Sequence, residues 1–227
     1  MLIERGLIYL LFFCCIFMSI VHAVSPEKAL DRLVQGNKRF TSDKLKHPNR
    51  TGMRREAIKT TQKPFAIILG CSDSRVPPEI IFDQGLGDLF IIRVAGNVID
   101  AVGIDSIEYA VNHLGSSIVL VLGHEKCGAV SAVVANQASD IPTIAKLIEP
   151  AVEKTRNLKG NHLVNAITAN INQVVEQIQQ TPVLIKLIDK KKLKIVGGYY
   201  HLETGKVDFL EAHLTAAASS AIHSALD

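Results

Sequence analysis

Two cysteines and one histidine of this chain have the residue types and the spacing of a metal site. Cys71 stands alone, whereas His124 and Cys127 are separated by two residues. Thiolate and imidazole are ligands that zinc prefers, and three protein ligands leave the fourth tetrahedral position open for water. The sequence therefore predicts a catalytic zinc site made of Cys71, His124 and Cys127, with one Zn²⁺ per subunit.

A carboxylate and a guanidinium follow the first thiol, at Asp73 and Arg75. On one tight turn the two can pair, so that Arg75 fixes Asp73 as the acceptor for the proton of zinc-bound hydroxide. An ordinary surface ion pair is the alternative, and it is the usual outcome away from a metal. Because two thiolates cancel the formal charge of zinc, we expect a weakly acidified water and an alkaline working range.

A disulfide is the alternative to the metal site. Cys14 and Cys15 lie in an N-terminal segment that we expect to be removed, which leaves Cys71 and Cys127 in an oxidising compartment. A structural disulfide, however, needs neither an acid and a base after one sulfur nor a histidine three residues before the other. The residues around the two thiols therefore favour a metal.

Two buried strands must position these turns. Residues 65–70 read F-A-I-I-L-G and residues 117–122 read S-I-V-L-V-L, and a turn with predicted ligands follows each run. Continuous apolar runs are typical of strands that are buried on both faces of a parallel sheet. Since ligands bind at the carboxyl edge of such sheets, we expect the two turns to meet there.

Other apolar runs and helix signals surround these two strands. Three more strands are predicted, at 89–94, 193–200 and 207–210. A helix starts at Ser25-Pro26, where serine can cap the first turn and proline suits the first helical position. Residues 36–63 are polar and irregular, and we expect an arm or loop over the core. The remaining helices are predicted at 77–83, 102–114, 129–135, 141–157, 161–180 and 182–191.

The N-terminal segment has the pattern of a secretory signal. Residues 7–21 are almost uninterruptedly apolar after Arg5, and Val21-His22-Ala23 suits a signal peptidase. An uncleaved membrane anchor is the alternative, but about 15 apolar residues are fewer than the roughly 20 that span a bilayer. We expect cleavage after Ala23, a periplasmic or secreted protein without a stable membrane anchor, and one domain over residues 24–227.

The charge of the chain excludes few partners but points away from nucleic acid. Its formal net charge is +3, and its one short lysine cluster, at residues 190–194, lies between a predicted helix and a predicted strand. Such a short run is usually a solvated turn. We therefore predict no nucleic-acid partner.

Four stretches of the sequence resemble the β-class carbonic anhydrases, here a bacterial member with a secretory signal peptide. They are C-S-D-S-R-V-P-P at 71–78, F-D-Q-G-L-G-D-L-F-I-I-R-V-A-G-N at 82–97, G-H-E-K-C-G-A at 123–129 and Y-Y-H-L-E-T-G-K-V at 199–207. The resemblance implies an α/β fold with a central, mainly parallel sheet: four parallel strands, an antiparallel edge strand, flanking helices and an N-terminal helical arm. It also implies a homodimer built by exchanged N-terminal helices, or a homotetramer.

The resemblance also assigns an activity and further site residues. It implies reversible hydration of CO2 to bicarbonate and a proton by attack of zinc-bound hydroxide, with Gln84 as a substrate-binding residue. In one subset of the family the aspartate matched by Asp73 becomes a fourth zinc ligand at lower pH, while bicarbonate binds a pocket that contains a tryptophan and an arginine. Arg93 matches the arginine, but this chain has Ile68 at the tryptophan position. We therefore predict that Asp73 rests on Arg75.

Two other functions stay open on sequence alone. Relatives of this family hydrolyse carbonyl sulfide or carbon disulfide on the same kind of zinc site, and access to the pocket sets that choice. A catalytically silent module that binds zinc or bicarbonate is the third possibility. The presence of both Asp73 and Arg75 argues against a silent module, because such a module could lose them and still bind metal.

Overall fold

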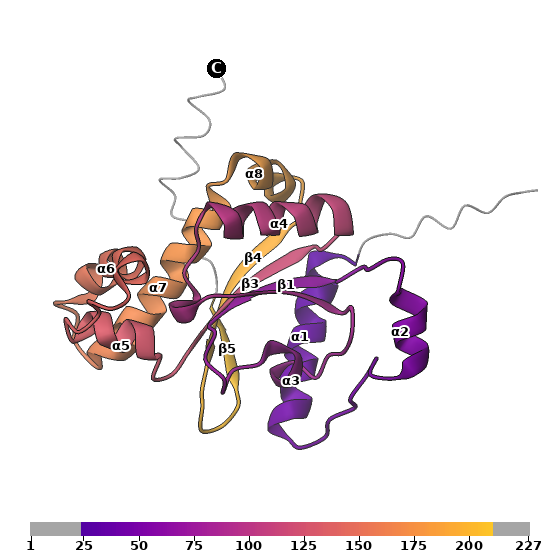
Figure 1. Cartoon of the computed structure of the whole chain (residues 1–227), viewed down its shortest axis with the longest axis horizontal. Coiled ribbons are helices and arrows are strands. Elements are labelled where there is room, and N and C mark those ends of the chain that lie inside the picture. Colours follow the sequence, from indigo (N-terminus) through magenta and orange to yellow (C-terminus); the bar gives the residue numbers. More distant parts are fainter. Residues whose placement is uncertain (1–23, 211–227) are drawn as a thin grey trace, which may run out of the picture.

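The structure is a computed structural model that describes residues 24–210, and its centre is one five-stranded sheet (Figure 1). The strand order is β2-β1-β3-β4-β5. Neighbouring strands among the first four are parallel, whereas β4 and β5 are antiparallel. The predicted α/β fold with an antiparallel edge strand is therefore confirmed. The strands are β1 (Ala66–Gly70), β2 (Leu89–Arg93), β3 (Ile118–His124), β4 (Lys194–Tyr200) and β5 (Val207–Leu210).

Helices surround this sheet (Figure 1). In that view α5, α6 and α7 form a group at one end of the sheet, whereas α1, α2 and α3 lie at the other end. Among these helices α7 makes the most extensive contact with the strands, through β3 and β4. The helices are α1 (Pro26–Thr41), α2 (Gly52–Ile58), α3 (Pro78–Ile81), α4 (Ala101–Leu114), α5 (Gly128–Val134), α6 (Pro142–Thr155), α7 (His162–Gln179) and α8 (Pro182–Asp189).

The central strands form the core, as their unbroken apolar sequences predict. Every residue of β1 and β3 is buried, because both strands have neighbours on each side and helices over their faces. The edge strand β2 differs, since all five of its residues are only half-buried. Its sequence L-F-I-I-R is nevertheless mostly apolar. One edge of the sheet therefore presents apolar side chains that the chain itself covers only in part.

The prediction of an irregular segment at residues 36–63 is wrong in two places. Helix α1 continues through Gly36 to Thr41, and α2 lies within the same segment. Gly36 is a close-contact residue and not a helix stop, because a Cβ there would lie 1.9 Å from the Phe82 carbonyl oxygen. The side chain of Thr51 accepts a hydrogen bond from Arg54 N and begins α2.

Helix α1 packs against its own chain. Ser25 caps it as predicted, accepting from Lys28 N at 3.4 Å, and Ala29 and Leu33 are fully buried. The side chain of Asn37 is bonded to Gly205 O and Val207 N at the start of β5. The apolar face of α1 is thus covered within one subunit, and exchange of this helix between subunits stays a prediction.

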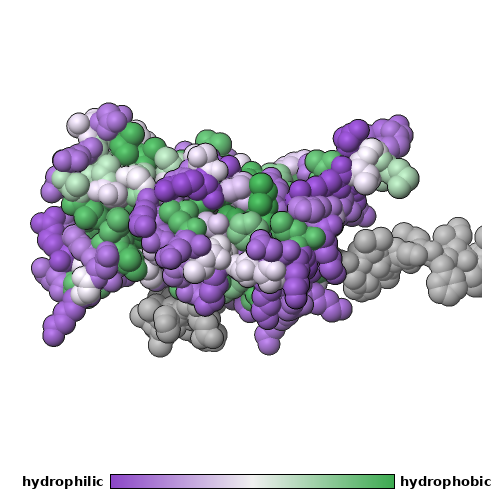
Figure 2. Space-filling model, turned by 90° about the horizontal axis from the view of Figure 1, so that it is seen from below, coloured by the Kyte–Doolittle hydropathy of each residue, from purple (hydrophilic) through white to green (hydrophobic). Residues whose placement is uncertain are grey.

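Two predictions fall partly or wholly outside the described residues. The signal segment at residues 1–23 and its cleavage after Ala23 lie there, as do the last residues of the predicted domain. Within residues 24–210 no helix is long and apolar enough to cross a membrane. Seen from below, the surface of this part carries separate groups of apolar side chains among hydrophilic ones (Figure 2).

Candidate metal centre

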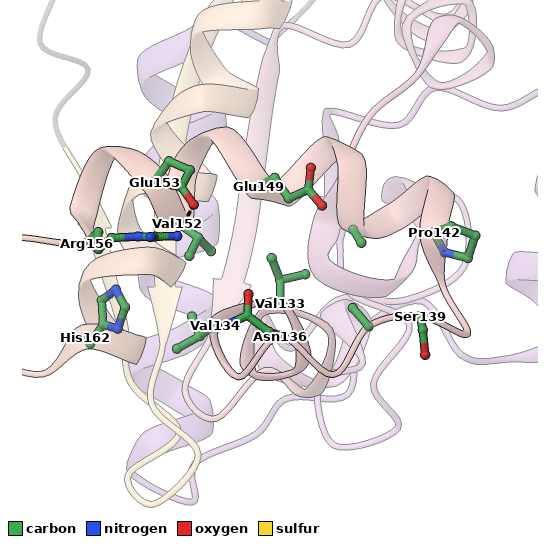
Figure 3. Close-up of a pocket in the computed structure, with 12 residues that line it drawn as sticks. Val133, Val134, Asn136, Ser139, Pro142, Glu149, Val152, Glu153, Arg156 and His162 are labelled. Atoms are coloured by element: carbon green, nitrogen blue, oxygen red, sulfur yellow. Dashed lines mark hydrogen bonds and ion pairs between the residues drawn. The ribbon is translucent and has the colours of Figure 1, made fainter.

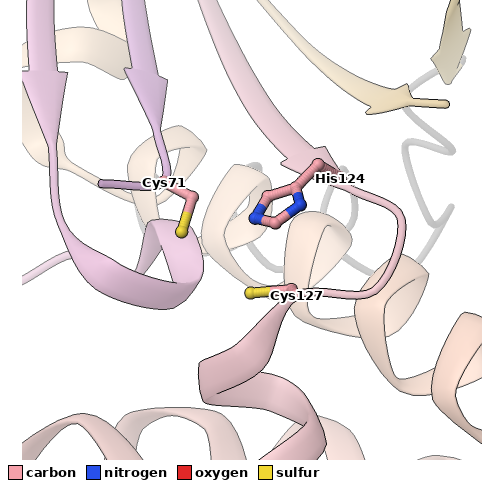
Figure 4. A group of neighbouring side chains, drawn as sticks. All are labelled: Cys71, His124 and Cys127. Atoms are coloured by element: carbon pink, nitrogen blue, oxygen red, sulfur yellow. The ribbon is translucent and has the colours of Figure 1, made fainter. Parts of the chain in front are cut away.

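The three predicted ligands meet at the carboxyl edge of the sheet. Cys71 directly follows β1, His124 is the last residue of β3, and Cys127 is the N-cap of α5. Since β1 and β3 are parallel neighbours, their ends lie side by side. The two Sγ atoms and the imidazole face one another, with all three ligand atoms within 4.8 Å of one another (Figure 4). All three residues are buried.

The ring of His124 is set to bind through Nε2. Its Nδ1 lies 2.9 Å from the carbonyl oxygen of Glu125, and because a carbonyl only accepts, Nδ1 carries the proton. The Nε2 atom is buried and has no hydrogen-bond partner among residues 24–210. Leaving a buried acceptor unpaired costs about 1–3 kcal/mol. A metal ion at this point would satisfy Nε2, so the donor set fits zinc.

Cys71 and Cys127 form no disulfide in the structure, so the disulfide alternative is wrong. A hydrogen bond from Cys127 is the main reason that the pKa of Cys71 is lowered to about 4, with smaller help from backbone N–H groups, against the effect of burial. Conversely, the hydrogen bond to Cys71 and burial raise the pKa of Cys127. The surroundings of Cys71 therefore favour its thiolate form, and a divalent ion would favour that form at both sulfurs.

The predicted pair of Asp73 and Arg75 is formed on the turn after Cys71. Arg75 donates from Nε to Asp73 Oδ1 at 3.0 Å and from Nη2 to Oδ2 at 2.7 Å, and its backbone N–H donates to Oδ1 at 2.9 Å. These bonds hold the pKa of Asp73 at about 2, so the carboxylate is ionised at neutral pH. Its Oδ2 lies 3.9 Å from His124 Nε2, so the fixed carboxylate stands beside the metal ligands.

Comparison with known proteins assigns this arrangement to a family. A family model described as carbonic anhydrase matches residues 66–207. Carbonic anhydrase 2 of Mycobacterium tuberculosis H37Rv is 50% identical over 189 residues, which cover 80% of this chain and 91% of that protein. A carbonic anhydrase of Mycolicibacterium smegmatis is 36% identical over 197 residues, which cover 84% of this chain and 95% of that protein. The chain belongs to the β-carbonic anhydrases.

Solved structures agree with this membership. The crystal structure of the β-carbonic anhydrase CafA of Aspergillus fumigatus matches with a TM-score of 0.68 at 26% identity, covering 88% of this chain and 97% of that chain. The β-carbonic anhydrase CcaA matches with a TM-score of 0.63 at 25% identity, covering 80% of this chain and 91% of that chain. The chain is thus an enzyme of the β-carbonic anhydrase family with a Cys-His-Cys cluster that can hold a metal.

Arg93 of this β-carbonic anhydrase fixes the turn that carries the first ligand. It is the last residue of β2, and it donates from Nε to Cys71 O at 2.8 Å and from Nη2 to Asp73 O at 2.5 Å. Both bonds go to main-chain carbonyls of the ligand turn. Ile68, two residues before the end of β1, is fully buried. In this structure the guanidinium of Arg93 therefore binds the main chain of the turn that carries Cys71 and Asp73.

Gln84 is not brought to the metal cluster within one chain. It is buried, and its Nε2 donates to Phe82 O at 2.8 Å. It lines a hollow of about 390 Å³ together with Arg50, Ile80 and Leu86, and none of the three metal ligands lines that hollow. The predicted role of Gln84 in substrate binding therefore stays a prediction.

A larger hollow, of about 620 Å³, lies between α5, α6 and the start of α7 (Figure 3). Glu149 and Glu153 line it from α6, Arg156 lines it from just after that helix, and Asn136 and His162 line it as well. None of the three metal ligands lines it either. The candidate metal centre of this family member is therefore a compact, buried cluster that lies in neither of these two hollows.

Sequence reasoning missed three residues that support the ligands. Glu125 accepts from His124 Nδ1 through its carbonyl, Gly96 donates its N–H to Cys71 Sγ at 3.3 Å, and Asn170 donates to Gly96 O at 2.8 Å. The first two act through the backbone, which the residue type does not reveal. Asn170 did leave a signal, because it is a polar residue on an otherwise apolar helix face.

Proposed function

We propose that this chain catalyses the reversible hydration of carbon dioxide to bicarbonate and a proton, with one zinc ion per subunit. The observation that carries the proposal is the buried cluster of Cys71, His124 and Cys127 with an unpaired Nε2, beside a carboxylate that Arg75 holds. The names of the similar proteins from Mycobacterium tuberculosis and Mycolicibacterium smegmatis support the same activity.

The residues of the site have separate tasks in this proposal. When bound, zinc supplies a Lewis acid that lowers the pKa of water, an effect for which carbonic anhydrases are themselves the standard example. Asp73 accepts a hydrogen bond from the attacking nucleophile and thereby orients its lone pair, and Arg75 keeps Asp73 ionised and in place.

Stopped-flow hydration of CO2 with a pH indicator tests the activity. The expected result is a rate far above buffer for zinc-replete protein, which Asp73→Asn lowers by about 10²- to 10⁴-fold. A zinc-replete sample no faster than buffer would contradict the proposal. Hydrolysis of carbonyl sulfide or carbon disulfide in its place would establish the second function, and binding of zinc without turnover of either substrate would establish the silent module.

Metal analysis of the purified protein tests the cofactor separately. We expect about one zinc per subunit in the wild-type protein, and strong loss of zinc in Cys127→Ser because one of three ligands is removed. Ser131→Ala is the control, since Ser131 lies one turn further along α5 and is no ligand. Near-full zinc occupancy in Cys127→Ser would show that the ligand set is wrong.

We also infer a homodimer or homotetramer, and export after cleavage behind Ala23. The half-buried apolar edge strand β2 supports assembly, because an open strand edge with apolar side chains is otherwise an aggregation hazard. The apolar run at residues 7–21 supports export. Intact-mass measurement of protein from the periplasmic fraction tests the cleavage; a full-length cytoplasmic species would contradict it.

A further inference from the structure

Asn170 is a buried polar residue at a position where the helix pattern calls for an apolar one. The buried face of α7 consists of apolar residues apart from Asn170, which is 1% exposed. Its Oδ1 accepts no hydrogen bond from any residue in 24–210. Burying an amide with one end unpaired costs free energy. The unpaired end of this amide is a cost that the contact of its other end has to offset.

The other end of the amide leads to the metal centre. Asn170 Nδ2 donates to Gly96 O at 2.8 Å, and Gly96 N donates to Cys71 Sγ at 3.3 Å. Gly96 has φ of 71°, a left-handed conformation that favours glycine, and a Cβ there would lie 2.8 Å from Ile148 Cδ1. The peptide groups around Gly96 therefore have one tightly packed orientation, and two consecutive hydrogen bonds join α7 to the thiolate.

The packing of α7 on the sheet holds Asn170 at this distance. Its neighbour Ile171 lies so close to the sheet that a Cβ on Gly123 would be 2.6 Å from Ile171 Cδ1, and one on Gly197 would be 2.8 Å from Ile171 Cγ2. Helix α7 thus packs on β3 and β4 through the side chain of Ile171, which lies against the residue that precedes His124. The packing of α7 therefore sets the position of Asn170 relative to Gly96.

We propose that Asn170 is a positioning residue of the metal centre, which holds the Gly96 N–H on the Sγ of Cys71 and thereby sets the affinity of the site for zinc. The inference rests on the proposed zinc site. An N–H bond to a thiolate fixes the direction of its lone pairs and stabilises its charge, as outer hydrogen bonds to metal ligands do in general. Without the amide of Asn170, the turn at Gly96 loses the contact that orients this N–H.

Zinc affinity of Asn170→Leu, measured by competition with a chelator, tests this role. Leucine keeps most of the volume and removes the donor, and we expect affinity to fall about 10- to 100-fold. Asn172→Leu is the matched control, because Asn172 is exposed two residues further along the same helix, and its affinity should equal that of wild type. Asn170→Ser, which keeps a hydroxyl donor, should lie between the two and is the second variant if the leucine variant does not fold.

The ¹¹³Cd-substituted protein gives a readout that a merely structural role would not move. In wild type we expect a scalar coupling between the Gly96 amide proton and ¹¹³Cd through the N–H to Sγ bond, with its loss in Asn170→Leu and a smaller coupling in Asn170→Ser. A folded variant with unchanged zinc affinity and unchanged coupling overturns the inference and leaves the zinc site intact. Failure of wild type itself to bind zinc or cadmium, or full binding by Cys71→Ser, overturns the proposed site instead.

Discussion

At the scale of single residues, the orientation of the Asp73 carboxylate depends on one planar group. The guanidinium of Arg75 bonds to both carboxylate oxygens, and its backbone N–H bonds to Oδ1 as well. A lysine ammonium keeps the charge but cannot form two parallel bonds to one carboxylate. The proposed reaction needs the carboxylate of Asp73 in one orientation. Arginine and lysine both supply the charge, but only arginine fixes this orientation.

Arg75→Lys should therefore lower kcat for CO2 hydration while zinc content stays unchanged. We expect a decrease of about 10²-fold, which is the usual effect of a small misplacement at a reacting centre. Arg156→Lys is the control, because Arg156 also pairs with a carboxylate, that of Glu153, but in an exposed pair away from the ligands. Stopped-flow rates and metal content of the two variants decide the question; equal kcat in both would remove the orienting role.

The resting position of Asp73 is a second prediction at this scale. Asp73 is paired with Arg75, and the Arg93 guanidinium is bonded to the carbonyls of Cys71 and Asp73. An isoleucine at position 68 cannot donate a hydrogen bond to an anion, and a donor to a charged partner is worth about 1.5–3 kcal/mol. We expect a crystal structure near neutral pH with bicarbonate to keep Asp73 on Arg75. Zinc coordinated by Asp73, with an anion beside Ile68 and Arg93, would contradict this.

The sequence was sufficient to predict that Cys71, His124 and Cys127 come together, but not the groups that hold them in place. Cys71, His124 and Cys127 could be found because sulfur and imidazole at the ends of apolar runs are unusual residue types in unusual places. The Gly96 N–H could not, because every residue except proline has such a group and only the φ of 71° aims it at Cys71. Asn170 lies far along the chain from Cys71, and only the packing of α7 on the sheet brings it near Gly96.

At the scale of elements, two glycines at corresponding places have different tasks. Gly70 ends β1 before Cys71, and Gly123 precedes His124 near the end of β3. A Cβ on Gly70 would meet nothing closer than 3.8 Å, whereas one on Gly123 would lie 2.6 Å from two atoms of Ile171. The first glycine can therefore accept a methyl group. The second cannot without moving α7, because Ile171 is fully buried.

Gly123→Ala should destabilise the fold, and Gly70→Ala should not. Overpacking of a buried contact costs about 1–3 kcal/mol, and we expect a decrease of that size in the free energy of unfolding of the metal-free protein. Urea unfolding of the two variants measures the difference under one condition. A Gly123→Ala protein as stable as the Gly70→Ala protein would show that α7 is not held closely against β3.

The boundaries of elements were less predictable than their existence. The strands and the later helices follow from apolar runs, but Gly36 within a polar stretch suggested that the first helix ended early. The reason for that glycine is the Phe82 carbonyl against which α1 packs, a contact between residues 46 positions apart. Helix α2 has no buried residue, so its sequence has no apolar face from which the helix could be predicted.

At the scale of the whole molecule, the two edges of the sheet differ. Strand β2 is an edge with half-buried apolar residues along its length, whereas β5 has only four residues, one of them Asp208. Phe90 lies on one edge strand and Phe209 on the other, and each packs on another aromatic ring of the chain, Tyr109 and Phe82 respectively. Assembly through an open edge is therefore expected at β2.

Phe90→Lys should convert the assembled protein to a smaller species. A lysine on an edge strand opposes strand pairing through its charge. Phe209→Lys is the matched control, and we expect it to leave the mass unchanged. Light scattering coupled to size-exclusion chromatography measures both. A monomeric wild-type protein would contradict the inferred assembly, and loss of assembly in Phe209→Lys alone would place the interface away from β2.

Two buried carboxylates tie the N-terminal arm to the body of the molecule: Asp88, which accepts from Asn49 Nδ2, and Asp83. Asp83 is fully buried and accepts hydrogen bonds from Lys46 N at 3.0 Å, His47 N at 2.9 Å and Arg39 Nε at 2.6 Å. Burial raises the pKa of Asp83, but these donors outweigh it, so the pKa lies below its ordinary value of 3.8. The ionised form is therefore favoured in the folded state.

The stability that Asp83 supplies should thus depend on pH in a defined direction. Since the folded pKa is depressed, the contribution is complete above the unfolded value of 3.8 and is lost as pH falls through the folded pKa. At neutral pH, Asp83→Asn should lower the free energy of unfolding by about 1.5–3 kcal/mol, the worth of a hydrogen bond to a charged group. The difference from wild type should shrink as pH falls below 3.8, whereas the control Asp140→Asn, at an exposed residue, should differ little from wild type throughout. Chemical unfolding at a series of pH values measures this, and a difference that grows towards acid would mean that the arm is held by something other than the carboxylate.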